Sequence, residues 1–425
     1  MKLLVRKSKL KGVVNSIPTS KSHTIRAVVF ASLASGTSRI LNPLASEDTK
    51  AAINGCSEFG AKIDTSNPRE WIITGFGGAP RKPAHALDAL NSGTSTNLLL
   101  SIAALGNFKT VIDGDSSIRK RPIQPLLDAL NKLGAKARSL NSNGCPPIEV
   151  EGRMNGGETE VECRSSQYVS SLLISCPLLE RESVIRVKNI CEIPYIEMTL
   201  RWLDEMGINY ERKGAEYFRI PPNQSYRAFK KQIPADWSSA AFPLCAAAIT
   251  NSDILFTGLD MNDTQGDKQI IDYLKKLGAT IEISKEGIRV KGAKLKGCVL
   301  DLNNTPDALP AISAVACFAE GETTIKNVAH ARIKETDRIK VMREELAKMG
   351  AQISELPDGL VIKKSSLHGA QVNGYSDHRV VMALSLAAMN AEGETEIDTA
   401  ESVAVTFPNY VELMRAVGAK LELKK

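Results

Sequence analysis

Several short polar segments of this chain carry side chains that bind anions or transfer protons. In chain order they are Lys21-Ser22 with Arg26, Asn91-Ser92-Gly93-Thr94, Arg119-Lys120-Arg121, Ser165-Ser166-Gln167, Pro306-Asp307, Lys334 to Arg338, and Asp377-His378-Arg379. Arginine and lysine bind phosphate and carboxylate groups, and Asp, Glu, His and Lys side chains can act as general acids and bases. A site that collected these segments would bind at least two anionic groups and could move protons.

Most of these segments stand directly before a stretch of apolar and small residues, which predicts a buried helix. The stretches are residues 22–34, 94–105, 166–179, 238–250, 307–319 and 378–389. Ser, Thr and Asp at such positions are explained by helix capping alone. Capping does not explain the cations Lys21, Arg26 and Arg379, because a cation opposes the positive end of the helix dipole. A bound anion would reconcile them with a helix start.

A glycine-containing phrase that repeats six times sets the architecture. The glycines are Gly60, Gly134, Gly207, Gly278, Gly350 and Gly418, and successive ones lie 68 to 74 residues apart. Each follows an amphipathic stretch, and most precede an alternating apolar run, which indicates a helix C-terminus and then a strand. We therefore expect six α/β units of about 70 residues in two groups of three. A chain of 425 residues is also long enough for two or three domains.

Composition narrows the class of protein. Hydrophobic residues make up 43% and charged residues 24%, no apolar run approaches the roughly 20 residues of a membrane span, and the N-terminus lacks a signal-peptide pattern. We expect a cytoplasmic protein with no membrane partner. The net charge of +6, with both signs interspersed, argues against a nucleic-acid partner and suits anionic small substrates.

Neither the cysteines nor the histidines suggest a metal site. The eight cysteines form no CxxC pair, and the five histidines are scattered without ligand spacing. We expect the cysteines to be small core residues rather than a disulfide framework.

The polar motifs, taken in order, resemble those of the enolpyruvyl transferases, and most closely the members that act on shikimate 3-phosphate. The matching segments are Lys21-Ser22-x-x-x-Arg26, Asn91-Ser92-Gly93-Thr94, Arg121-Pro122-Ile123, Ser165-Ser166-Gln167, Pro194-Tyr195-Ile196, Pro306-Asp307-Ala308, Lys334 to Arg338, Asp377-His378-Arg379 and Thr406-Phe407-Pro408. They span nearly the whole chain. Each motif is weak by itself, but the ordered set is specific.

The resemblance implies a fold and a domain division. The fold would be α/β, with two similar domains, each of three βαβαββ repeats around buried parallel helices, an inside-out α/β barrel. Residues 14–232 would form an upper domain, and residues 1–13 with 233–425 a lower one. The active site would lie in the cleft between the domains.

The resemblance also implies a reaction. The enolpyruvyl (1-carboxyvinyl) group of phosphoenolpyruvate would pass to the 5-hydroxyl of shikimate 3-phosphate with release of phosphate, on the pathway to chorismate and the aromatic amino acids. No cofactor or metal would be needed, and we expect a monomer whose partners are the two substrates.

The resemblance assigns roles to individual residues. Shikimate 3-phosphate would be bound by Lys21, Ser22, Arg26, Ser165, Ser166, Gln167, Tyr195, Asp307 and Lys334. Phosphoenolpyruvate would be bound by Lys21, Gly93, Arg121, Gln167, Arg338 and Arg379. Asp307 would accept the hydroxyl proton, and Glu335 and Lys21 would move the other proton. His378 would orient Glu335 or a phosphate oxygen.

Four residues depart from the family pattern. Asn97 stands where many members carry Arg, His330 where Asn is common, and Val405 where one branch has Lys. Glu192 stands where a Ser often binds the 3-phosphate, and a carboxylate repels a phosphate. Either Glu192 turns away or the acceptor is not a phosphorylated shikimate.

Other functions remain open. An enolpyruvyl transferase could act on a different cyclitol or sugar alcohol, although residues 114–118 lack the loop cysteine typical of the members that use a UDP-amino sugar. Six α/β repeats also describe ring-shaped DNA clamps, but those carry basic helices, whereas the cations here stand at helix tips.

Overall fold

The apolar, small-residue stretches of the sequence fold into buried helices, as their composition predicts. They are α1 (Lys21–Leu33), α3 (Gly93–Ala103), α5 (Ser166–Ser175), α7 (Trp237–Ile249), α9 (Leu309–Ala316) and α11 (His378–Ala388). Every residue of α7 is buried. Helices α5 and α9 fall furthest short of their predicted lengths. Helix α5 passes into the 3-10 turn η2 (Cys176–Leu178), where Pro177 lacks an N–H donor, and α9 is preceded by the 3-10 turn η4 (Pro306–Ala308).

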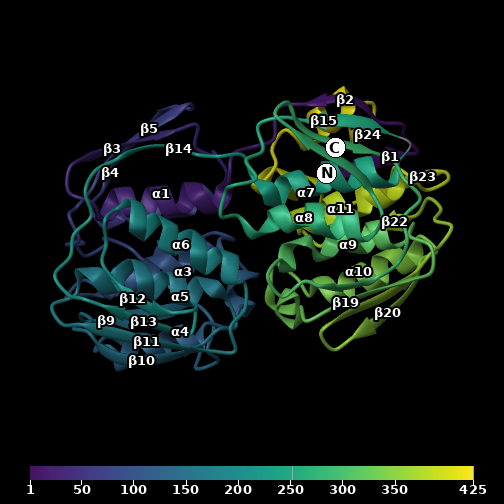
Figure 1. The fold of residues 1–425 in the computed structure, drawn as a ribbon. Coiled ribbons are helices and arrows are strands. Elements are labelled where there is room, and N and C mark those ends of the chain that lie inside the picture. The colour runs from purple at the N-terminus through teal and green to yellow at the C-terminus, as the bar shows by residue number, and fades with distance from the viewer. Residues whose placement is uncertain (251, 425) are drawn as a thin grey trace. The chain divides into compact units, whose positions relative to one another are not determined.

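The computed structural model describes residues 1–250 and 252–424, and they divide into two units, each with a hydrophobic core of its own (Figure 1). The central unit comprises Thr19–Pro234, and the terminal unit comprises Met1–Pro18 together with Ala235–Lys425. Helices α1, α3 and α5 belong to the central unit, and α7, α9 and α11 belong to the terminal unit.

Three four-stranded sheets surround the buried helices of each unit, and all six sheets share one pattern. In the central unit the orders are β14 (Lys230–Gln232), β3 (Thr37–Leu41), β5 (Glu70–Thr74), β4 (Lys62–Asn67); β6 (Leu87–Asp88), β7 (Lys109–Asp113), β9 (Ile148–Glu151), β8 (Lys136–Ser139); and β10 (Gly157–Glu162), β11 (Ser183–Lys188), β13 (Tyr217–Ile220), β12 (Glu211–Lys213). In the terminal unit they are β2 (Lys11–Val14), β15 (Asp253–Phe256), β17 (Gly287–Lys291), β16 (Thr280–Ser284); β18 (Val299–Asp301), β19 (Glu322–Lys326), β21 (Gly359–Lys363), β20 (Gln352–Leu356); and β22 (Gln371–Val372), β23 (Glu394–Ile397), β1 (Lys2–Arg6), β24 (Lys420–Lys424). In every sheet the first two strands are parallel and the others are antiparallel, which is the predicted βαβαββ repeat.

The second helix of each repeat is amphipathic and ends at a predicted glycine. These helices are α2 (Glu47–Glu58), α4 (Gln124–Lys132), α6 (Ile193–Glu205), α8 (Ile270–Lys276), α10 (Arg338–Lys348) and α12 (Tyr410–Ala416). All six glycines have positive φ, between 71° at Gly207 and 117° at Gly60, as a left-handed helix cap requires. Further 3-10 turns are η1 (Ile118–Lys120), η3 (Gly266–Gln269), η5 (Ala329–Ile333) and η6 (Ala400–Val405).

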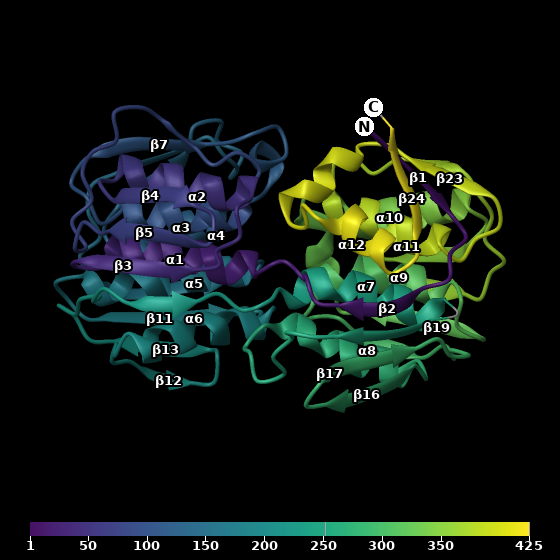
Figure 2. The same cartoon turned by 90° about the horizontal axis from the view of Figure 1, so that it is seen from above.

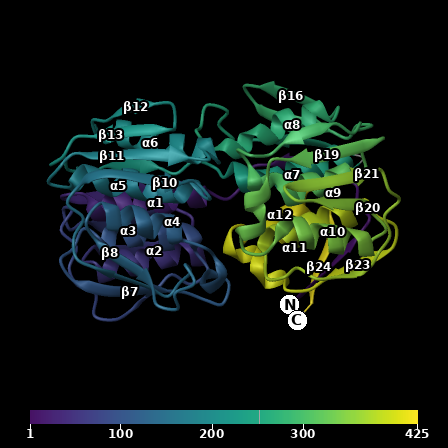
Figure 3. The same ribbon diagram turned by 90° about the horizontal axis from the view of Figure 1, so that it is seen from below.

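Side-chain contacts show that neighbouring buried helices run in parallel. Ser171 of α5 donates to the Asn97 carbonyl of α3, and four residues further along both helices Ser175 donates to Ser101. Because the contacts advance in the same direction on both helices, the polar starts of α3 and α5 lie at one end of the central unit. Figures 2 and 3 show the sheets of each unit arranged outside its helices.

Three sheets are completed by strands from a distant part of the sequence. The N-terminal strands β1 and β2, purple in Figure 2, lie in the terminal unit, where β1 separates β23 from β24. Strand β14 completes the first sheet of the central unit. The units meet in sequence at residues 18/19 and 234/235, against the expected 13 and 233. Residues 11–14 stay with the terminal unit because they pair with Asp253–Phe256.

All eight cysteines are free thiols, six of them buried, which agrees with the predicted role as small core residues. Across residues 1–250 and 252–424, no helix combines the length and the apolar character that crossing a membrane requires.

Candidate active site

The terminal unit holds a cluster of two arginines and three carboxylates, which we call the arginine–carboxylate cluster: Asp307, Glu335, Arg338, Asp377 and Arg379. Arg338, Asp377 and Arg379 are buried, and Asp307 and Glu335 are partly exposed. Arg338, the first residue of α10, is completely buried. Its guanidinium donates to Asp377 at 2.8 and 3.1 Å, to Asp307 at 2.7 Å and to Glu335 at 2.6 Å. The chain thus brings the start of α10, the start of α11 and the turn before α9 together through one side chain.

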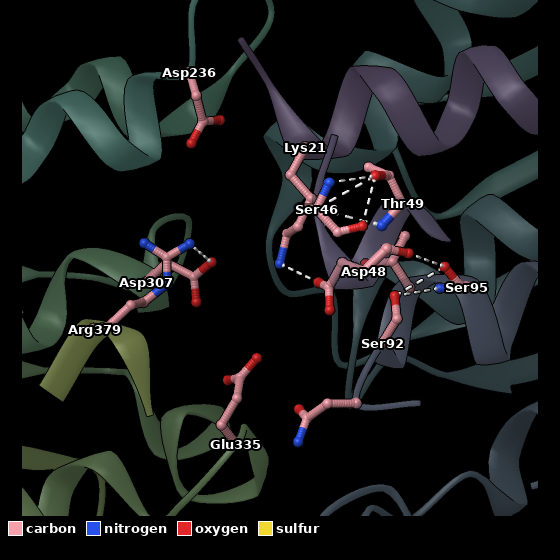
Figure 4. Close-up of polar contacts among 12 residues, drawn as sticks. Lys21, Ser46, Asp48, Thr49, Ser92, Ser95, Asp236, Asp307, Glu335 and Arg379 are labelled. Atoms are coloured by element: carbon pink, nitrogen blue, oxygen red, sulfur yellow. Dashed lines mark hydrogen bonds and ion pairs between the residues drawn. The ribbon is translucent and has the colours of Figure 1, made fainter. Parts of the chain in front are cut away.

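Asp307 bridges the two arginines of this cluster. Its second oxygen lies 2.9 Å from the Arg379 guanidinium (Figure 4). Burial raises the pKa of Asp307, but the charges of Arg379, Arg338 and Lys334 outweigh burial and hold that pKa well below its usual range. Asp307 is therefore an ionised acceptor in a cationic setting, ready to accept a hydrogen bond from a hydroxyl group.

The start of α11 supplies two further predicted residues. Asp377 caps the helix by accepting from the Arg379 N–H at 2.9 Å, and His378 is its first helical residue, 2% exposed. Sequence reasoning assigned no role to Asp377, although the capping position was visible. Its bidentate bond to Arg338 could not be read from the sequence.

In the central unit, Lys21 stands at the start of α1 and pairs with Asp48. The ammonium group lies 2.8 Å from the Asp48 carboxylate, which belongs to the first turn of α2 (Figure 4). This pairing explains how a cation can stand at a helix start, because the Asp48 carboxylate compensates the charge of Lys21. Sequence reasoning missed Asp48, whose place in the first turn of an exposed helix suggests only dipole stabilisation.

Arg26 lies one turn further into α1 and is surrounded by neutral acceptors. Its guanidinium donates to the Thr199 hydroxyl at 2.9 Å, the Ser170 hydroxyl at 3.3 Å, and the carbonyls of Ser22 and Tyr195 at 3.2 Å. Burial lowers the pKa of Arg26 to about 10, so it remains a cation at neutral pH. A buried cation with these neutral hydrogen-bond partners can attract an anion, and its role in binding the acceptor's carboxylate stays a prediction.

Ser165 and Ser166 form the start of α5, and the carboxylate of Glu192 lies against them. The Ser165 hydroxyl caps the helix through the Gln167 N–H. One Glu192 oxygen accepts from the Ser166 N–H at 3.0 Å, the Ser166 hydroxyl at 2.7 Å and the Ser165 hydroxyl at 3.5 Å. Of the two possibilities raised by the sequence, Glu192 does not turn away from these serines.

Gln167 is held in a fixed orientation by the start of α3. Its side-chain oxygen accepts from Asn97 at 2.8 Å, and its amide nitrogen donates to Thr94 at 3.1 Å. Asn97, one of the departures from the family pattern, therefore positions a predicted substrate-binding residue.

Gly93 and Arg121 are also neighbours at this end of the central unit. A Cβ added to Gly93 would lie 2.8 Å from a terminal nitrogen of Arg121. The Arg121 guanidinium donates to Asn91 at 2.9 Å and to Ser117 at 3.2 Å. Only glycine leaves room for this arginine beside the start of α3.

The predicted site residues fall into two sets. The central unit carries Lys21, Ser22, Arg26, Gly93, Arg121, Ser165, Ser166, Gln167 and Tyr195, and the terminal unit carries Asp307, Lys334, Glu335, Arg338, His378 and Arg379. His330 is partly buried in η5, and Val405 is the last residue of η6. Over residues 1–250 and 252–424, no group of three or more His, Cys, Asp or Glu side chains could hold a metal ion.

Known proteins resemble this chain over its full length. The family model for EPSP synthase (3-phosphoshikimate 1-carboxyvinyltransferase) matches residues 5–414. A 3-phosphoshikimate 1-carboxyvinyltransferase from Ruminiclostridium cellulolyticum is 50% identical, with 100% of both chains covered. One from Acetivibrio thermocellus is 48% identical, with 99% of both covered. The solved structure of EPSP synthase from Acinetobacter baumannii is 28% identical, with a TM-score of 0.83 and 100% of both chains covered.

Proposed function

The chain belongs to the EPSP synthase (3-phosphoshikimate 1-carboxyvinyltransferase) family, and from this premise we propose that it is a transferase of the shikimate pathway. It transfers the enolpyruvyl group of phosphoenolpyruvate to the 5-hydroxyl of shikimate 3-phosphate and releases phosphate, a step toward chorismate and the aromatic amino acids. The observation that carries the proposal is the arginine–carboxylate cluster, which combines an ionised acid with cations able to bind phosphate and carboxylate groups.

Asp307 is the base for the attacking hydroxyl in this proposal. In the structure its charge is compensated by Arg338 and Arg379, which makes it a weak base. When phosphoenolpyruvate binds these arginines, its negative groups share their charge, so the proton affinity of Asp307 rises. Substrate binding thereby prepares the base that the reaction needs.

The bonds and protons of the reaction balance in two stages. The 5-hydroxyl oxygen bonds to C2 of phosphoenolpyruvate while its proton passes to Asp307 and C3 receives a proton, which gives a tetrahedral intermediate. Phosphate then leaves from C2, and C3 loses a proton to restore the double bond. In this proposal Glu335 and Lys21 move the proton that C3 gains and loses, and His378 orients Glu335 or a phosphate oxygen.

The remaining residues bind the substrates. Arg26 holds the acceptor's carboxylate, Ser22, Tyr195 and Lys334 line the acceptor position, and Ser165 and Ser166 donate to its 3-phosphate. Lys21, Arg121, Arg338 and Arg379 bind phosphoenolpyruvate beside Gly93, and Gln167 contacts both substrates. Because these residues come from both units of the chain, the proposed reaction needs the central unit and the terminal unit. Small-angle scattering with and without both substrates tests whether substrate binding compacts the protein.

The direct test is phosphate release by the purified protein from phosphoenolpyruvate and shikimate 3-phosphate, with the product identified by mass spectrometry. We expect one phosphate per enolpyruvyl product, and little turnover by Asp307→Asn. No release at saturating concentrations of both substrates would refute the proposal. We also propose that the protein is a cytoplasmic monomer that needs no cofactor. Light scattering during size-exclusion chromatography would test the monomeric state.

One observation favours a second candidate, an acceptor without a 3-phosphate. The donors proposed for that phosphate already bond to Glu192. Unphosphorylated shikimate, assayed beside shikimate 3-phosphate at equal concentration, separates the two acceptors. Faster phosphate release with shikimate would favour the second candidate.

A further inference from the structure

Glu192 has the geometry of an anion bound at a helix start. It is 2% exposed, and its carboxylate oxygen accepts from one backbone N–H and two hydroxyl groups at the first turn of α5. Backbone N–H groups at a helix start, helped by the dipole and by hydroxyl side chains, form a common binding arrangement for phosphates and carboxylates. The chain therefore supplies its own anion to this helix.

The donors that hold Glu192 cannot serve a second anion at the same time. The Ser166 N–H and hydroxyl carry one proton each, and both are directed at Glu192, at 3.0 and 2.7 Å. Carboxylate and phosphate oxygens are both acceptors, so they compete for these protons. Two negative groups at one helix start also repel each other. An incoming phosphate must therefore displace the carboxylate.

The start of α5 offers Glu192 three neutral donors, which belong to Ser165 and Ser166. Arg164, the nearest arginine in sequence, is about half exposed and pairs with Glu162. Burial raises the pKa of Tyr168 in α5, the charge of Glu192 raises it further, and the charge of Arg164 lowers it.

The backbone at Glu192 has an unusual conformation. Glu192 lies between β11 and α6 as the residue before the helix, with a left-handed φ of 51°. A non-glycine residue rarely adopts this conformation, and it stores strain. The carbonyl of Glu192 accepts from the Tyr195 N–H at 3.0 Å at the start of α6, and because the side chain takes no part in this backbone bond, its rotation away from α5 leaves the bond intact.

We propose that Glu192 occupies the 3-phosphate position of the acceptor site and sets the affinity and selectivity of the enzyme for its acceptor. The inference rests on the proposed function. The acceptor binds only after its phosphate displaces the carboxylate from Ser165 and Ser166, so Glu192 weakens the binding of phosphorylated acceptors. Shikimate, which has no phosphate, leaves the carboxylate in place.

The test compares Glu192→Ser and Glu192→Gln with the wild-type protein. We expect Glu192→Ser to lower KM for shikimate 3-phosphate about tenfold or more, since charge-assisted hydrogen bonds no longer oppose binding. Glu192→Gln keeps an acceptor oxygen but loses the charge, so its KM for shikimate 3-phosphate should lie between that of the wild type and that of Glu192→Ser. KM for phosphoenolpyruvate should change less than about twofold. The matched control is Glu197→Gln in α6, because that glutamate pairs with Arg212 and is 39% exposed.

Calorimetric titration with shikimate 3-phosphate alone separates this inference from the proposed function. Tighter binding by Glu192→Ser without turnover by any protein would support the inference and refute the reaction. Turnover with an unchanged or raised KM for shikimate 3-phosphate in both variants would overturn the inference, and so would an absence of binding by all of the proteins. Thermal unfolding of each variant identifies misfolding, and Glu192→Gln, which is nearly isosteric, keeps the test decisive if Glu192→Ser does not fold.

Discussion

A single guanidinium, that of Arg338, forms hydrogen bonds with three carboxylates inside the terminal unit. Asp377, which takes two of its hydrogen bonds, is completely buried. Burial lowers the pKa of Arg338, but the three carboxylates outweigh burial and raise that pKa well above its ordinary value. This residue therefore links the turn before α9 with the starts of α10 and α11.

Replacement of Arg338 by alanine should therefore destabilise the fold as well as the site. The change leaves Asp377 buried without its cation, and loss of one partner of a buried pair costs about 3 to 5 kcal/mol. The control is Arg289→Ala, because Arg289 forms a similar bidentate pair with Asp253 at the surface of the same unit, where a pair contributes at most about 1 kcal/mol. Urea unfolding of both variants measures the difference, and equal losses would contradict this reading of the cluster.

The charge of Asp307 should make stability depend on acid pH. Cations hold its folded pKa below the unfolded value of about 3.9. A lowered carboxyl pKa stabilises the fold fully above the unfolded value, and this stabilisation is lost as the pH falls toward the folded value. We expect the gap in unfolding free energy between wild type and Asp307→Asn to be constant from pH 7 to 5 and to narrow from pH 4 to 2. Urea titrations at each pH measure it, and a constant gap throughout would count against the shift.

At the scale of elements, Gly93 at the start of α3 has no side chain and so leaves room for the Arg121 guanidinium. Gly93→Ala would place a methyl group 2.8 Å from the guanidinium, and because that group ends a flexible side chain, the arginine moves and the helix does not. We expect a melting temperature within a few degrees of wild type and a KM for phosphoenolpyruvate raised about tenfold, corresponding to one lost charge-assisted hydrogen bond.

A double-mutant cycle identifies the route of this effect. If Gly93→Ala acts through Arg121, it should add little to the KM of Arg121→Ala. Full additivity of the two changes would mean that the methyl group meets the substrate directly.

Elements whose signals are local could be predicted from the sequence. The six cap glycines, the apolar helices and the polar helix starts each depend on neighbouring residues, and the structure confirms them. Contacts that need two elements to meet could not be predicted. The bond between Glu192 and Ser166 joins residues 26 positions apart, and the sequence indicated only that the two groups conflict. Strand β14 is a further case, because Lys230–Gln232 has no apolar pattern and is defined only by its pairing with β3.

At the scale of the whole molecule, the two units differ in how the chain completes them. The core of the central unit draws only on residues 25–233, so a fragment of residues 19–234 contains every strand of its three sheets. The terminal unit needs β1, which lies between β23 and β24 and buries Leu3, Leu4 and Val5. Burial of three such side chains contributes about 5 to 9 kcal/mol, comparable to the whole stability of a typical domain.

The two units should consequently behave differently as fragments. We expect residues 19–234 to unfold cooperatively alone, and residues 235–425 to lack a cooperative transition. A permuted fragment, in which a short linker joins residue 425 to residue 1 and the chain ends at residue 18, should regain that transition. The linker can be short because Lys2 pairs with Lys424 in the antiparallel ladder, which brings the chain ends together (Figure 1). Circular dichroism during heating measures all three fragments. If residues 235–425 alone melted as sharply as the permuted fragment, the N-terminal strands would be dispensable for this fold.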